Sequence, residues 1–162
     1  MTTKADFTPQ EWEALLEAPV LTGLYISLAS PSLAGSIGES MAVAKTIVAT
    51  AKEGTGDALL GALLADLQNR DAAKVARPDL STRKPDELKQ EVLSGLRKAM
   101  VLAEQKASAD EKQGFGQWLY SVAVNVAEAS KEGGFLGMGG VRVSDEEKAA
   151  LIELAGIFGV NA

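Results

Sequence analysis

Four short stretches of the sequence carry the signature of a helix start, and each precedes apolar residues at helical spacing. Thr8-Pro9-Gln10-Glu11 combines a capping hydroxyl, a proline at the first helical position and an acid that reaches back to the cap. The same Ser-x-x-Glu spacing recurs at 36–39, 108–111 and 144–147. Such boxes satisfy backbone donors that the first helical turn leaves unpaired. Because no segment shows sustained period-2 alternation, the sequence predicts an all-α fold without a sheet.

The apolar periodicity places about seven helices in one domain that spans residues 1–162. The expected helices are 9–17, 19–29, 37–52, 57–69, 85–107, 109–129 and 145–158. A new helix is expected to start at Pro19, because proline is favoured in a first helical turn. Residues 1–7 are expected to form an N-terminal tail. The sequence therefore predicts a single-domain helical bundle.

Two of these helices are expected at the centre of the bundle, because they are apolar nearly all round. One is 19–29, and the other is 109–129. Within 118–127 the only clearly polar residues are Ser121 and Asn125, four apart, which we expect to form a buried hydrogen-bonded pair. The side chains expected to be almost fully buried are Trp118, Leu119, Val122 and Val126.

The chain contains no cysteine and no histidine, and its net charge is −6. Structural zinc, iron–sulfur clusters and Cys- or Ser–His nucleophiles require those side chains. Paired carboxylates could still act as in glycosidases, but such enzymes need a deep cleft that a small bundle seldom provides. We therefore expect no cofactor and no enzymatic activity. An acidic chain without a basic stripe is not expected to bind nucleic acid. We see no secretory signal and no apolar run of the roughly 20 residues that a transmembrane helix needs. We therefore expect a cytoplasmic protein of bacterial type.

Two stretches indicate an internal repeat of a helix–loop–helix unit. In ASPSLAGSIGESMAVAK (29–45) and ASKEGGFLGMGGVRVSDEEKAALIE (129–153), an apolar helix ends in Ala-Ser, a loop follows, and a Ser-x-x-Glu cap opens an amphipathic helix. Aligning the caps pairs Val43 with Leu151 and Ala44 with Ile152, and we expect these pairs on the buried side. We interpret the two stretches as copies of one pseudo-repeated unit.

The two copies differ in the length of their loops. The first loop spans six positions, from Ser30 to Ser36, and the second spans fourteen, from Ser130 to Ser144. The difference of eight matches the eight residues of GGFLGMGG, 133–140. We interpret this glycine-rich stretch as an insertion into the second copy.

The doubled turn and cap resemble the TerB-like tellurite-resistance family. The acids after the caps, Glu39 and Glu147, match the family pattern. The family usually carries Ala-Asp-Gly in the turn, whereas this chain has Ala-Ser-Pro at 29–31 and Ala-Ser-Lys at 129–131. The resemblance implies an all-helical, stress-associated module that works through partners, sometimes near the membrane, rather than a catalyst.

The glycine-rich insertion is the main candidate for a contact with a partner. Its residues are Gly133, Gly134, Phe135, Leu136, Gly137, Met138, Gly139 and Gly140. The three apolar side chains are costly to expose, so they fit a protein partner, self-association or a peripheral membrane contact. They could equally fold back and complete the core. A phosphate cradle is less favoured, because the loop lacks the Lys-Ser/Thr of a P-loop and follows no strand.

Two further sites remain open. Glu128, Glu132 and Asp145 could offer oxygen ligands to Ca²⁺ or Mg²⁺, although acids in a first helical turn are expected for dipole reasons alone. Tyr25 and Tyr120 could line a small apolar pocket between the central helices. The sequence thus favours a non-enzymatic interaction module, with an apolar-ligand or divalent-metal binder as the alternative.

Overall fold

The computed structural model describes residues 1–29, 36–69, 84–132 and 143–162, without the side chains of 36–40 and 130–132. All regular structure in this part of the chain is helical. It comprises the 3₁₀ helix η1 (Lys4–Asp6) and the α-helices α1 (Pro9–Ala29), α2 (Ser36–Glu53), α3 (Ala58–Gln68), α5 (Pro85–Lys106), α6 (Ala109–Glu132) and α7 (Asp145–Phe158). The expectation of an all-α fold is confirmed. The loops compared in the repeat hypothesis, 30–35 and most of 130–143, lie outside the described residues, so the repeat stays a prediction.

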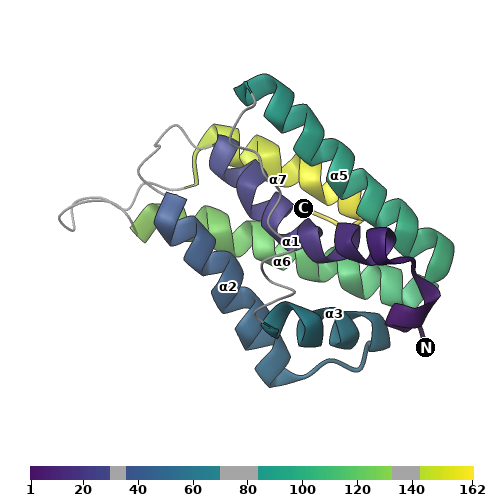
Figure 1. Cartoon of the computed structure of the whole chain (residues 1–162). Coiled ribbons are helices and arrows are strands. Elements are labelled where there is room, and N and C mark those ends of the chain that lie inside the picture. The colour runs from purple at the N-terminus through teal and green to yellow at the C-terminus, as the bar shows by residue number, and fades with distance from the viewer. Residues whose placement is uncertain (30–35, 70–83, 133–142) are drawn as a thin grey trace.

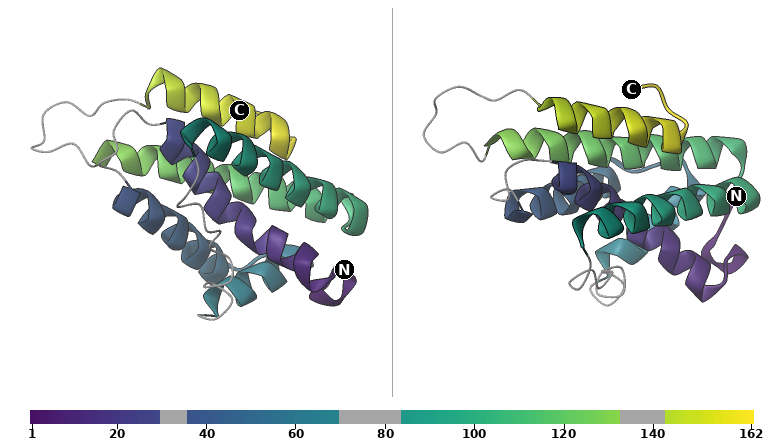
Figure 2. Two further views of the ribbon diagram at one scale, coloured as in Figure 1. Left: turned by 45° about the horizontal axis from the view of Figure 1, so that its top comes forward. Right: turned by 90° about the horizontal axis from the view of Figure 1, so that it is seen from above.

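The bundle is built around α1 and α6, which lie side by side in its middle (Figures 1 and 2). Helices α5 and α7 cover one side of this pair, and α2 and α3 close the opposite side (Figure 1). The long helix α6 packs against both α2 and α7. None of the described helices is long and apolar enough to cross a membrane.

The first two expected helices are one helix, because α1 continues through Pro19. A proline inside a helix removes one hydrogen bond and costs about 3 kcal/mol. Here the apolar face runs unbroken across it, since Leu15, Ala18 and Leu21 are buried on either side of the proline. Packing of that face against α5 and α6 outweighs the local cost, as tertiary contacts commonly do for helices. The prediction of a helix start at Pro19 is therefore wrong.

Three of the four expected capping boxes are formed. Thr8 and Glu11 exchange hydrogen bonds at the start of α1, Ser108 and Glu111 at the start of α6, and Ser144 and Glu147 at the start of α7. The fourth pair, at 36–39, lies among the side chains that are not described.

Residues 1–7 pack onto the bundle instead of forming a free tail. The ring of Phe7 belongs to the core and lies 5.5 Å, centroid to centroid, from that of Trp12. Thr2 is buried, and its backbone N–H donates to Glu111 Oε1 at 2.8 Å. This segment therefore ties the start of the chain to the start of α6, 109 residues further on.

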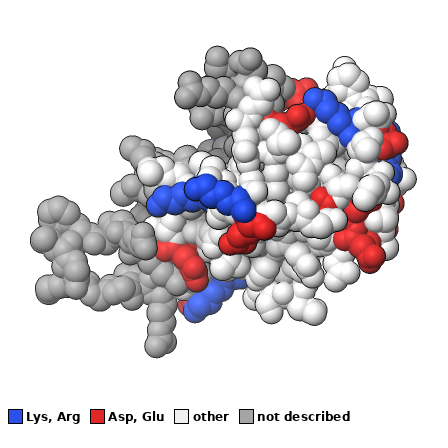
Figure 3. All heavy atoms as spheres, turned by 90° about the horizontal axis from the view of Figure 1, so that it is seen from below, with Lys and Arg blue, Asp and Glu red and all other residues white. Residues whose placement is uncertain are grey.

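Figure 3 views the molecule from the side of α2 and α3, where uncharged residues cover most of the described surface. Helix α3 carries one charged residue, Asp66, and all five of its leucines are buried. In α2 the only charge between Met41 and Ala51 is Lys45. This side of the bundle is thus poor in the charges that usually cover a protein surface.

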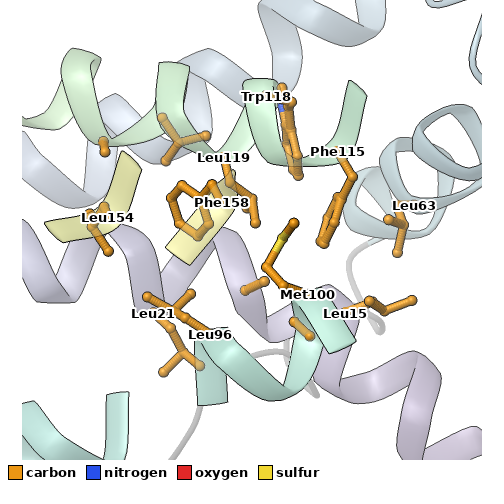
Figure 4. Packing of buried hydrophobic residues seen from close by; sticks show 14 of the residues in the cluster. Leu15, Leu21, Leu63, Leu96, Met100, Phe115, Trp118, Leu119, Leu154 and Phe158 are labelled. Atoms are coloured by element: carbon orange, nitrogen blue, oxygen red, sulfur yellow. The ribbon is translucent and has the colours of Figure 1, made fainter. Parts of the chain in front are cut away.

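The core forms where α1, α3, α5, α6 and α7 meet (Figure 4). Met100 of α5 points between Phe115 of α6 and Phe158 of α7 (Figure 4). Helices α6 and α7 approach closely at Gly116, where an added Cβ would stand 2.5 Å from the carbonyl oxygen of Phe158. The expected central residues of α6, Trp118, Leu119, Val122 and Val126, are all buried, which confirms the central position of this helix.

Candidate functional site

The outer face of α2 carries an exposed apolar row at positions i, i+3 and i+7. It consists of Met41, Ala44 and Val48, which we call the α2 stripe. The side chain of Met41 is 53% exposed and that of Val48 is 44% exposed. Large apolar side chains on one helix face are the kind of surface that partners cover. Lys45 and Lys52 flank the stripe, and both are exposed.

Contacts on the inner face of α2 fix the rotation of the helix and so determine which residues point outward. Val43 is buried beside Gly23 of α1, where an added Cβ would meet the Val43 Cγ2 atom at 2.5 Å. Thr46 Oγ1 donates to the carbonyl oxygen of Ala42 and accepts a hydrogen bond from Asn125 Nδ2 of α6 at 2.9 Å. With this side held, the α2 stripe is turned to solvent.

The link from Asn125 to Thr46 also corrects an expectation about α6. Ser121 and Asn125 do not form a buried pair, because both residues are exposed. Ser121 instead donates to the carbonyl oxygen of Trp118 at 2.7 Å. The side of α6 that carries these two polar residues faces the edge of α2 and solvent, so α6 is not apolar all round.

Helix α7 presents a second apolar row with the same spacing. Its residues are Ala149, Ile152 and Gly156, all exposed, which we call the α7 stripe. The side chain of Ile152 is 64% exposed, and open space surrounds Gly156. Buried Leu154 and Phe158 hold the opposite face of α7 against the core.

The two stripes overturn one expectation from the repeat alignment. Val43 is buried and Leu151 is half-buried, as expected, but Ala44 and Ile152 are exposed. The reason is the rotation of the two helices: the buried neighbours are Ala42 and Val43 on α2, and Ala150 with half-buried Leu151 on α7. On both helices the buried face lies one residue earlier than the alignment suggested.

A hollow of about 470 Å³ lies at the N-terminal ends of α3 and α6. Its polar lining comes from Asp57, which caps α3, and from Ser108, Asp110 and Glu111 at the start of α6. Asp57 Oδ1 accepts from the N–H of Leu60 at 2.9 Å. Burial, together with the charge of Glu111, raises the pKa of Asp57 above its usual value.

Glu111 is the most heavily hydrogen-bonded carboxylate of this hollow. It accepts from the N–H and hydroxyl of Thr2 at 2.8 and 2.6 Å and from the N–H and hydroxyl of Ser108 at 3.0 and 2.9 Å. These donors, those of Thr2 above all, lower the pKa of Glu111 to about 2. Because Asp57 and Glu111 both serve as helix caps, the arrangement acts as a structural junction between α3, α6 and the first residues of the chain.

The sequence-predicted sites fall partly outside the described residues. The loop 133–140 lies outside them entirely, and so does the side chain of Glu132. Glu128 is exposed, and Asp145 lies in the first turn of α7 with its carboxylate 3.1 Å from the Lys148 ammonium. Among the described residues no group of three or more acids is arranged to hold a metal ion.

The two tyrosines of the predicted apolar pocket lie on the two central helices, Tyr25 on α1 and Tyr120 on α6. The pocket between them stays a prediction. The hydroxyl of Tyr25 donates to the carboxylate of Glu153 on α7, and burial with this bond raises the Tyr25 pKa. Tyr120 is half-buried and packs against the core.

Sequence reasoning missed the two stripes and the junction at Glu111. The stripes could have been found by drawing each capped helix as a wheel, because the apolar arcs of α2 and α7 are wider than one buried face requires. The hydrogen bonds between Thr2 and Glu111 could not have been found from the sequence, since the two residues lie far apart in it and share no local pattern.

Comparison of the chain with known protein families, curated proteins and solved structures finds no match.

Proposed function

We propose that this protein is a non-enzymatic helical interaction module that binds a protein partner through the α2 stripe. The observation that supports the proposal most directly is the outward exposure of Met41 and Val48 on a helix whose inner face is already packed. Burying such side chains against a partner contributes about 25 cal/mol for each Å² of apolar surface removed from water.

The acidic groups of the hollow support the same reading. Glu111 and Asp57 are bound to backbone and hydroxyl donors, and so their carboxylates stabilise helix ends. Glu147 serves as a cap in the same way at α7. Charged groups that are used in this manner do not need a catalytic role to explain them.

Two sequence features extend the proposal. We treat the helix–loop–helix stretches 29–45 and 129–153 as copies of one unit, so that α2 and α7 are equivalent helices. The resemblance of their turns and caps to the TerB-like family adds a stress-associated role to the proposal. The alternative function, binding of a small apolar ligand or a divalent metal, has no specific contact among the described residues in its favour.

A photo-crosslinking experiment tests the α2 stripe. Val48 is replaced by p-benzoylphenylalanine in the full chain, and the matched control carries the same probe at Val101 on the outer face of α5. The two positions are similarly exposed, at 44% and 48%. We expect a discrete crosslinked adduct from position 48 after irradiation in cells, and none from position 101. Equal labelling at both positions, or no adduct at position 48, would refute the proposed function.

A further inference from the structure

The α2 and α7 stripes occupy equivalent positions on their helices. Counted from Ser36 and Ser144, both stripes fall on the fifth, eighth and twelfth residues. Their side-chain sizes are complementary. Along the α2 stripe, small Ala44 lies between the bulky side chains of Met41 and Val48. Along the α7 stripe, bulky Ile152 lies between the small residues Ala149 and Gly156. Helices pack by placing large side chains of one into gaps above small residues of the other.

The charges beside the stripes are complementary as well. Lys45 and Lys52 lie on one flank of the α2 stripe, and Glu146 and Glu153 lie on the corresponding flank of the α7 stripe. All four residues are exposed. Opposite charges on matching flanks of two helices select the partner and its orientation.

The same charges select an antiparallel arrangement. With Ala44 laid opposite Ile152, Met41 comes opposite Gly156 and Val48 comes opposite Ala149, so that each bulky side chain faces a small one. Lys45 then lies near Glu153 and Lys52 lies near Glu146, because corresponding flanks face each other in an antiparallel pair. A parallel pair would instead bring Lys45 beside Lys148, so that two positive charges would repel.

We propose that the α2 stripe of one copy of this chain binds the α7 stripe of a second copy in an antiparallel helix pair. This inference rests on the proposed function and specifies its partner. Helices α2 and α7 pack on α6 from different sides of the bundle (Figures 1 and 2). One such contact therefore leaves a free stripe on each copy, and the association is head-to-tail.

A single helix pair buries less surface than the roughly 1,600 Å² of a standard stable interface. The association is consequently weak, with a dissociation constant on the order of 100 µM. Because the contact is head-to-tail, species larger than dimers appear as the protein concentration rises.

Two variants and their mixture test the pairing by sedimentation velocity across a concentration series. Val48→Asp disables the α2 stripe and Ile152→Asp disables the α7 stripe, and each replaces an exposed side chain. We expect the unaltered chain to associate with rising concentration and each variant alone to remain monomeric. An equimolar mixture of the two variants retains one intact α2 stripe and one intact α7 stripe, so it forms dimers and nothing larger.

Val101→Asp is the matched control, because Val101 is equally exposed on α5 and belongs to neither stripe. It should associate like the unaltered chain. The inference is overturned if the unaltered chain stays monomeric up to about 1 mM, ten times the expected dissociation constant. It is also overturned if either stripe variant still associates alone, or if the mixture grows beyond dimers. Unfolding of a variant is excluded by its circular dichroism and melting temperature.

A charge exchange tests the antiparallel register. Lys52→Glu and Glu146→Lys should each weaken association about tenfold, and the chain carrying both substitutions should regain it. Failure of the double substitution to restore association refutes this register. The crosslinking experiment distinguishes the two proposals. If the chain does not self-associate but position 48 forms an adduct with a different protein, the self-pairing is refuted and the proposed interaction module is retained.

Discussion

Replacing Glu111 with glutamine should loosen the junction that fastens the first residues of the chain to α6. The substitution keeps the size and shape of the side chain but replaces one acceptor oxygen with an NH₂ group. Glu111 accepts four hydrogen bonds, three of them on Oε2 and one on Oε1. The side chain of glutamine has only one acceptor oxygen. Its NH₂ group must therefore face either the one donor that binds Oε1 or the three donors that bind Oε2.

The pKa of Glu111 sets the magnitude of this effect. A pKa lowered from 4.5 to about 2 corresponds to about 3 kcal/mol, at about 1.4 kcal/mol per pKa unit. Glu111 is only 7% exposed, but it borders an open hollow, and glutamine keeps part of its hydrogen bonds. We therefore expect about 1–2 kcal/mol of stability to be lost. For a chain of this size that loss lowers the melting temperature by about 2–8 °C.

The effect should depend on pH in a defined direction. Because folding lowers the pKa of Glu111, its contribution is complete above about pH 4.5 and disappears as the pH falls toward about 2. Urea unfolding of the unaltered chain and of Glu111→Gln should therefore differ at pH 7 and converge toward pH 2. Glu104→Gln, in an exposed pair with Lys112, is the control and should change stability by less than about 1 kcal/mol. A Glu111→Gln chain as stable as the unaltered one at pH 7, or a difference that does not shrink in acid, would show the reasoning to be wrong.

Three further substitutions or deletions probe the core and the insertion. Leu119→Ala removes a fully buried side chain of α6 and should cost about 2–5 kcal/mol in a denaturant melt; a neutral result would contradict the central position of α6. Gly116→Ala would place a methyl group 2.5 Å from the Phe158 carbonyl oxygen and should cost about 1–3 kcal/mol, whereas Gly61→Ala, whose nearest neighbour is 3.6 Å away, should be neutral or slightly stabilising. Deleting residues 133–140 should leave the melting temperature unchanged, because the shorter loop between Ser30 and Ser36 joins the corresponding helices of the first copy. A large decrease would instead assign Phe135, Leu136 and Met138 to the core.

The helices themselves were largely predictable because their signals are local. Capping boxes depend on residues three apart, and those at Thr8, Ser108 and Ser144 all form. Pro19 shows the limit of such signals. The local preference of Pro19 favours a helix start. The burial of Leu15 and Leu21 in a shared core depends on partners such as α5, which begins more than 60 residues further along the sequence.

The surface was harder to predict than the core. An apolar residue on a helix predicts burial, and for Val43 that prediction is right. Ala44 and Ile152 have the same character but lie on arcs that none of the described helices covers. Which arc is covered depends on the rotation of each helix, and in α2 that rotation is fixed by Gly23 and by the Asn125–Thr46 hydrogen bond. Neither contact has a local signal.

The central placement of α1 has a consequence for how the chain emerges from the ribosome. Helix α1 is synthesised before α5 and α6, yet these two helices complete its buried face. Val126, which lies beside Gly23, is made about 100 residues later, or about 5–20 s later at typical rates of elongation. During that interval Leu15, Leu21 and Ile26 have no native partner from α6. The nascent chain is therefore a natural client for chaperones that shield apolar segments, and rapid synthesis of residues 84–132 would shorten its exposure to aggregation.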